Sequence, residues 1–153
     1  IIEAFKGLNK KLIVLGDGPE LKNLQQNATL NIEFRGFVDE TTVRDVVSKA
    51  KAFIHIGVED VGIAPIEAQS CGTPIIAYKQ GGVLETVIHE KTGLLFNSQS
   101  KDALLKTLQK FEKMTWNPLI IHQHANNFSE ERFTNEITAY VLKCEKEYFS
   151  KVN

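Results

Sequence analysis

The feature that most constrains this fold is an alternation of short strand-like runs with helical segments along residues 11–113. Runs rich in β-branched and other apolar residues lie at 11–15, 32–34, 52–56, 73–77 and 93–96. Segments between them carry apolar residues at helical spacing. Strands that alternate with helices are typical of parallel sheets covered by helices. The pattern therefore predicts an α/β fold, a Rossmann-like doubly wound parallel sheet with helices on both faces.

Helices are expected between these strands and again after the last one, where no further strand-like run occurs. The expected helices span 19–27, 39–50, 62–71, 83–89, 101–113, 117–126 and 129–149. We therefore expect one domain over residues 1–153, with an α/β core over about 1–113 and C-terminal helices over 114–153. The last helix carries an apolar stripe, which either packs on the domain or is exposed and drives self-association: Phe133, Ile137, Tyr140, Val141, Cys144 and Tyr148.

Charge and cysteine content exclude several kinds of function. The formal net charge of −1 gives no electrostatic case for nucleic acid as a partner. Cys71 and Cys144 have neither a CxxC nor a metal-binding spacing, so we expect no metal site and a reducing compartment. The sequence shows no recognisable signal peptide and no run of about 18 apolar residues. These observations favour a cytoplasmic location.

The first residues resemble the second half of an amphipathic helix. Residues 1–8 have no capping residue before them, and the chain starts at Ile1 rather than at methionine. Helices normally begin with a residue that satisfies the free N–H groups of the first turn. We therefore expect the domain to be truncated at its N-terminus.

Glycine-rich loops follow the predicted strands, at 16–18, 35–39, 57–62 and 78–82. In an open parallel sheet, ligands bind beyond the carboxyl ends of the strands, where helix N-termini favour anions. The loops therefore favour a phosphate-containing ligand, although glycines can also simply end strands. A dinucleotide fingerprint is not met, because its third glycine would fall at Leu21. The chain has no P-loop motif either.

Two glutamates, Glu59 and Glu67, flank a predicted helix start with seven residues between them. Carboxylates are good acceptors for sugar hydroxyls. The alternative for Glu67 is a surface glutamate on an amphipathic helix. Among the histidines, His55 is expected to be a packed strand residue, and His122 and His124 are expected to lie on the surface.

Several ordered motifs within residues 1–113 resemble the retaining glycosyltransferases of family 4. The motifs that carry this resemblance lie at residues 16–21, 34–38, 59–76, 81–87 and 92–96. These enzymes have the GT-B architecture, in which two Rossmann-like domains face each other across a cleft. The resemblance places this chain in the C-terminal, nucleotide-sugar-binding domain. The last forty residues match the family only loosely.

The resemblance implies a role for each residue around the helix start. Glu59 matches the glutamate that contacts the donor sugar hydroxyls, and it is the expected catalytic residue. Glu67 matches the glutamate that holds the nucleotide ribose. Gly62 and Ile63 match the helix start whose backbone amides approach the sugar and the phosphate.

The other loops carry further donor-binding residues by the same resemblance. Phe37 and Val38 match the loop that frames the base. Gly81 and Gly82 resemble the small-residue loop at the wall of the cleft. Gly18 lies in an upstream loop that matches the same domain, and it is assigned to the nucleotide-binding residues.

Two departures from the family pattern bear on activity. Val61 stands where the family usually has phenylalanine, a position expected to wedge the loop rather than to react. The Gly-Arg strand end and the following lysine, which stabilise the leaving diphosphate in the family, are not in this chain. Such charges often supply the largest part of catalysis, so this chain alone is expected to be inactive.

The resemblance implies a full-length hexosyltransferase in polysaccharide biosynthesis. It would move a hexose, with mannose as the first expectation, from a GDP- or UDP-linked sugar to a glycan or lipid-linked acceptor. The acceptor would be held by an N-terminal domain, and no metal or cofactor would be needed. Peripheral association with the inner face of a membrane is compatible with such acceptors. The alternatives are a GT-B-like sugar-nucleotide epimerase and a binding-only nucleotide-sugar module.

Overall fold

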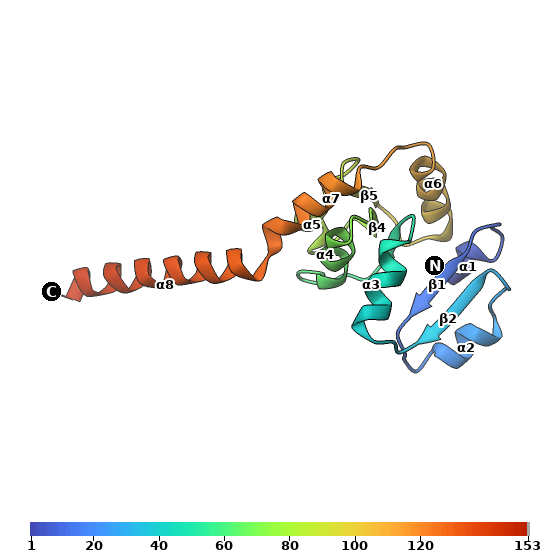
Figure 1. Cartoon of the computed structure of the whole chain (residues 1–153), viewed down its shortest axis with the longest axis horizontal. Coiled ribbons are helices and arrows are strands. Elements are labelled where there is room, and N and C mark those ends of the chain that lie inside the picture. Colours follow the sequence, from blue (N-terminus) through green and yellow to red (C-terminus); the bar gives the residue numbers. More distant parts are fainter. Residues whose placement is uncertain (153) are drawn as a thin grey trace.

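The computed structural model describes residues 1–152 and has the predicted α/β composition (Figure 1). Residue 153, the end of the predicted helical region, lies outside the described part. The strands are β1 (Leu12–Leu15), β2 (Ile32–Gly36), β3 (Phe53–His55), β4 (Ile75–Tyr78) and β5 (Gly93–Phe96). The helices are α1 (Ile2–Phe5), α2 (Leu21–Gln26), α3 (Glu40–Ser48), α4 (Ile63–Ser70), α5 (Val83–Thr86), α6 (Lys101–Phe111), α7 (Pro118–Ala125), the 3-10 turn η1 (Asn126–Phe128) and α8 (Glu130–Val152).

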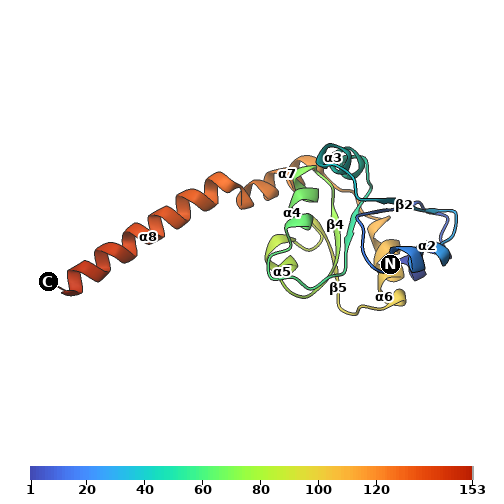
Figure 2. The same ribbon diagram turned by 90° about the horizontal axis from the view of Figure 1, so that it is seen from below.

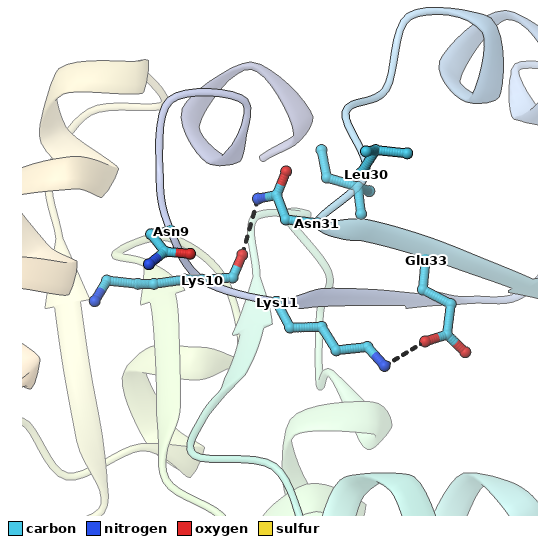
Figure 3. A pocket seen from close by; sticks show the side chains of 7 residues that line it. Asn9, Lys10, Lys11, Leu30, Asn31 and Glu33 are labelled. Atoms are coloured by element: carbon cyan, nitrogen blue, oxygen red, sulfur yellow. Dashed lines mark hydrogen bonds and ion pairs between the residues drawn. The ribbon is translucent and has the colours of Figure 1, made fainter.

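The strands pair in parallel, as predicted, but they form two sheets rather than one. β1 pairs with β2, while β3, β4 and β5 form a separate sheet in that order. The two sheets run across each other (Figures 2 and 3). The apolar runs predict that strands form, but they do not specify which strands pair, because pairing depends on long-range backbone hydrogen bonds.

The sheet of β3, β4 and β5 is buried on both faces, as the apolar runs predict. On β4, Ile76 packs in a cluster with α1 and α6 and with side chains of β1 and β2. Its neighbours Ile75 and Ala77 pack on the opposite face, in a cluster with α3, α4 and α5. All three side chains are fully buried. Alternate residues of β4 therefore pack against different layers of helices on the two faces of the sheet.

Two of the later helices start at polar side-chain caps. The Ser100 hydroxyl accepts a hydrogen bond from the Ala103 N–H at 3.2 Å, at the start of α6. The Asn117 side chain accepts from the Leu119 N–H at 3.0 Å, at the start of α7. Both contacts satisfy N–H groups that have no partner within the helix.

Helix α4 ends at a glycine that allows α7 to approach closely. Gly72 has φ +77°, a left-handed conformation that favours glycine after a helix end. A Cβ at this position would lie only 2.9 Å from the Cβ of Pro118, the first residue of α7. Glycine is therefore required both by the backbone conformation and by the packing of α7.

Helix α8 projects away from the α/β body (Figures 1 and 2). Residues of its apolar stripe are exposed, with Phe133 at 67% and Tyr140 at 64%. The apolar stripe of α8 therefore does not pack on this domain. Within the described residues, no helix combines the length and apolarity needed to cross a membrane.

Candidate functional site

The candidate site is centred on the loop between β3 and α4, which carries Glu59. Gly62 precedes the first residue of α4 and has φ +76°, a conformation that favours glycine. A Cβ on Gly62 would lie 4.0 Å from Glu59 Oε2. The exposed Glu59 carboxylate therefore lies beside the N-terminus of α4. Its side chain makes no hydrogen bond or ion pair with the rest of residues 1–152.

A second glycine loop packs directly against the Glu59 loop. The Gly82 N–H donates a hydrogen bond to the Glu59 carbonyl at 2.8 Å. A Cβ on Gly81 would lie 2.4 Å from the same carbonyl oxygen, and a Cβ on Gly82 would lie 2.3 Å from the Val61 oxygen. No larger residue fits at either position without backbone movement. These two glycines therefore fix the Glu59 loop against the start of α5.

Glu67 lies one helical turn into α4, four residues after Ile63. Residues four apart share one face of a helix. Both residues are exposed, with Ile63 at 65%, and the Glu67 side chain has no bonded partner in the described part of the chain. The exposed face of α4 therefore carries the unpaired Glu67 carboxylate about one turn after the Glu59 loop.

The other predicted binding residues lie on loops of the β1–β2 sheet. Gly18 donates its N–H to the Asp17 side chain at 2.7 Å, and Phe37 is 87% exposed beside the half-buried Val38. No hydrogen bond in residues 1–152 joins these positions to the Glu59 loop. The structure thus brings Glu59, Gly62, Gly81 and Gly82 together, but leaves the base-framing loop on the separate sheet.

The sequence predicts only a packing role for His55, a polar residue close to Glu59. The ring of His55, at the end of β3, has a buried Nε2 with no hydrogen-bond partner among the described residues. The available sequence signal was a polar residue at the end of an otherwise apolar run. That signal alone does not separate a packed histidine from a functional one.

The two histidines of α7 were expected on the surface, but only His122 is exposed, and both rings contact neighbouring helices. His122 is exposed, but its Nδ1 lies 2.6 Å from the Ser70 carbonyl at the end of α4. His124 is half-buried, and its Nε2 lies 3.1 Å from the Thr86 carbonyl at the end of α5. Both rings therefore attach α7 to the ends of neighbouring helices. Within the described residues, no group of three or more His, Cys, Asp or Glu is placed to hold a metal ion.

A hollow of about 530 Å³ lies elsewhere, at the amino ends of β1 and β2 (Figure 3). It is lined by Asn9, Lys10, Lys11, Leu30, Asn31, Ile32 and Glu33. Its charged groups are already paired: Lys10 bonds Glu112, and Lys11 lies 2.5 Å from Glu33. The Lys11 and Arg35 hydrogen bonds lower the pKa of the Glu33 carboxyl below its ordinary value. The hollow is at the opposite edge from the predicted site and presents no free charge of its own.

Solved structures with the same arrangement are glycosyltransferases and related enzymes. Sucrose-phosphate synthase from Thermosynechococcus elongatus matches with a TM-score of 0.67 and 25% identity, over 97% of this chain and 41% of that one. Anabaena HepE in complex with UDP and glucose matches with a TM-score of 0.71 and 22% identity, over 93% of this chain and 43% of that one. The fold is therefore that of a GT-B glycosyltransferase domain.

Sequence comparison identifies the family of this chain. The family model for glycosyl transferases group 1 matches residues 1–132, and the chain belongs to this family. A GDP-mannose-dependent alpha-(1-6)-phosphatidylinositol monomannoside mannosyltransferase from Mycobacterium tuberculosis is 34% identical over 104 residues, which is 60% of this chain and 27% of that protein. A D-inositol 3-phosphate glycosyltransferase from Saccharomonospora viridis is 29% identical over 90% of this chain and 36% of its own length. The matched part of this chain thus spans between about a quarter and about a third of the length of these relatives.

Proposed function

We propose that this chain is the donor-binding domain of a retaining glycosyltransferase of the family-4 type. The full protein would move a hexose from a nucleoside diphosphate sugar to a glycan or lipid-linked acceptor. Membership of glycosyl transferases group 1 supports the reaction class. The observation that carries the binding site is the Glu59 carboxylate, which has no partner in the described chain and lies at the N-terminus of α4.

The geometry suggests how each part of the donor would be held. The free N–H groups at the start of α4 favour a diphosphate, because a helix N-terminus stabilises anions. Glu59, beside that terminus, would accept hydrogen bonds from sugar hydroxyls and orient the sugar. Glu67, exposed on the same helix, would accept from the ribose hydroxyls. In this proposal Glu59 is the catalytic residue, and Gly62 and Ile63 supply backbone contacts to the phosphate.

The base would be framed by Phe37 and Val38, with Gly18 in the adjoining loop. The exposure of the Phe37 ring supports this part, because an exposed aromatic face can stack on a planar base. Gly81 and Gly82 would form the wall of the site by holding the Glu59 loop in place. No metal or organic cofactor has a part in this proposal.

The donor we propose first is GDP-mannose, with UDP-sugars as the alternative. The Mycobacterium tuberculosis relative is named as GDP-mannose-dependent, whereas HepE is described in complex with UDP and with UDP-glucose. The same relative is named for a phosphatidylinositol mannoside. A lipid-linked acceptor, bound by another part of the full protein at a membrane surface in the cytoplasm, is therefore part of the proposal.

The ribose role of Glu67 is tested by calorimetric titration of the chain with GDP and with UDP. Glu67→Ala should weaken the affinity for the preferred nucleotide by about fivefold, the effect of losing one hydrogen bond. The control is Glu131→Ala, which removes an exposed glutamate on α8 far from the site. Equal affinities for wild type and Glu67→Ala would contradict the ribose role. Failure of the wild type to bind either nucleotide would contradict the proposed function.

A further inference from the structure

His55 and Glu59 approach each other across a residue that has no side chain. A Cβ built on Gly57 would lie 3.4 Å from Cε1 and 3.6 Å from Nε2 of His55. The same point lies 3.7 Å from Oε1 of Glu59. The edge of the imidazole ring and the carboxylate therefore lie within 3.7 Å of the same point beside Gly57, a point that no side chain of residue 57 fills.

Both groups lack the partner that the other could provide. The buried Nε2 of His55 has none among the described residues, and a buried polar atom without a partner destabilises the fold. The Glu59 carboxylate is likewise unbonded within residues 1–152, and its side chain is exposed. An imidazole N–H and a carboxylate form one of the stronger hydrogen bonds in proteins.

We propose that His55 is a positioning residue for Glu59: its Nε2–H donates a hydrogen bond to the Glu59 carboxylate and orients it toward the donor sugar. This inference rests on the proposed function, in which Glu59 binds that sugar. Nε2 is covered from solvent, so it acts through Glu59 rather than on the ligand. One oxygen of Glu59 would take the histidine hydrogen bond and leave the other for the sugar.

The first test needs no ligand. The ring nitrogens of His55 are followed by long-range ¹H–¹⁵N NMR in the wild-type chain and in Glu59→Ala. The Nε2 resonance should move when Glu59 is removed. The matched control is Asp60→Ala, the neighbouring exposed carboxylate, which should leave it in place. An Nε2 resonance that is identical in wild type and Glu59→Ala would overturn the proposal, whether or not the chain binds nucleotides.

The second test measures binding of GDP-mannose and UDP-glucose, each against its free nucleotide. His55→Phe keeps an aromatic ring but removes the donor, and should weaken binding of the nucleotide sugar by about fivefold while leaving the free nucleotide unchanged. His55→Gln places an amide N–H near the Nε2 position and should restore most of the affinity. Thermal unfolding of each variant shows whether it is folded.

The third measurement separates positioning from packing. In a Glu59→Ala background, His55→Phe should have no further effect on binding of the nucleotide sugar, because the partner is already gone. An undiminished effect in that background, or equal binding by wild type and His55→Phe, would overturn the role of His55. Loss of all nucleotide binding in the wild type would instead count against the proposed function, and the ring resonance would still decide the role of His55.

Discussion

Asn31 holds the turn that leads from α1 into β1. Its Nδ2 donates to the carbonyls of Phe5 and Lys10 at 2.9 Å each, and to that of Leu8 at 3.1 Å. The bond to Lys10 is drawn in Figure 3. One half-buried amide therefore satisfies several backbone acceptors that no strand or helix pairs. Residues of this kind fix the junction between a helix and the sheet on which it packs.

Replacing Asn31 with alanine should lower the free energy of unfolding by about 1–3 kcal/mol, because the carbonyls of Leu8 and Lys10 would lose the Asn31 donor and that of Phe5 would keep only the Leu8 N–H. Urea unfolding of the chain measures this change. Asn9→Ala is the matched control, since Asn9 lines the same hollow, is exposed, and makes no side-chain hydrogen bond within the described residues. Equal unfolding free energies for the two variants would show that the Asn31 bonds contribute nothing measurable.

For single residues, the sequence shows which side chains are present but not which other residues they contact. The glycines at 81 and 82 could be assigned to a loop beside the site from their place in the pattern. Their contact with the carbonyl of Glu59 depends on the packing of segments more than twenty residues apart. The role of Asn31 could not be predicted from sequence, because its acceptors lie in a turn more than twenty residues before it. The role of His55 likewise depends on where the Glu59 loop folds.

Helix α3 begins at a charged cap. The Asp39 carboxylate accepts from the Thr42 N–H at 2.8 Å and from the Thr42 hydroxyl at 3.0 Å. These hydrogen bonds, with the backbone N–H as the larger cause, hold the pKa of Asp39 below its ordinary value. A lowered pKa in the folded state means that the carboxylate stabilises the fold above its ordinary pKa. That contribution is lost as the pH falls through the lowered value.

The thermal midpoint of the wild type should therefore fall more steeply than that of Asp39→Asn as the pH is lowered from about 5 to about 3. Asparagine can still cap the helix but cannot titrate, so the comparison isolates the charge of Asp39. Other carboxylates with lowered pKa, such as Glu33, titrate equally in both proteins. Midpoints that stay a constant distance apart over this range would contradict the account of α3.

At the scale of elements, local signals predicted more than long-range ones. Each predicted strand overlaps an observed one, because runs such as 73–77 are apolar on both faces and must be buried. The caps at Ser100 and Asn117 are local contacts as well, each to a backbone N–H two or three residues along the chain. The pairing of strands could not be read from the same signals. The single predicted sheet is instead two, since no local rule states that β1 and β3 should share hydrogen bonds.

At the scale of the whole molecule, the parts divide between a packed body and a projecting helix. The body buries residues of β4 on both faces of its sheet, while α8 leaves its apolar stripe exposed (Figure 1). The sequence predicted the stripe from its spacing, but it left open whether the stripe packs on this domain. Spacing identifies an apolar face, whereas its partner depends on the path of the chain after η1.

We propose that the Glu59 loop and the start of α4 bind a nucleoside diphosphate sugar. The most direct measurement is an NMR titration of backbone amides with GDP-mannose and, separately, with UDP-glucose. At least one donor should shift the amides of residues 59–64 and 81–82, while those of 9–11 and 30–33 around the opposite hollow stay unchanged. Shifts confined to that hollow, or none with either donor at about millimolar concentration, the weak limit of specific binding, would contradict the claim.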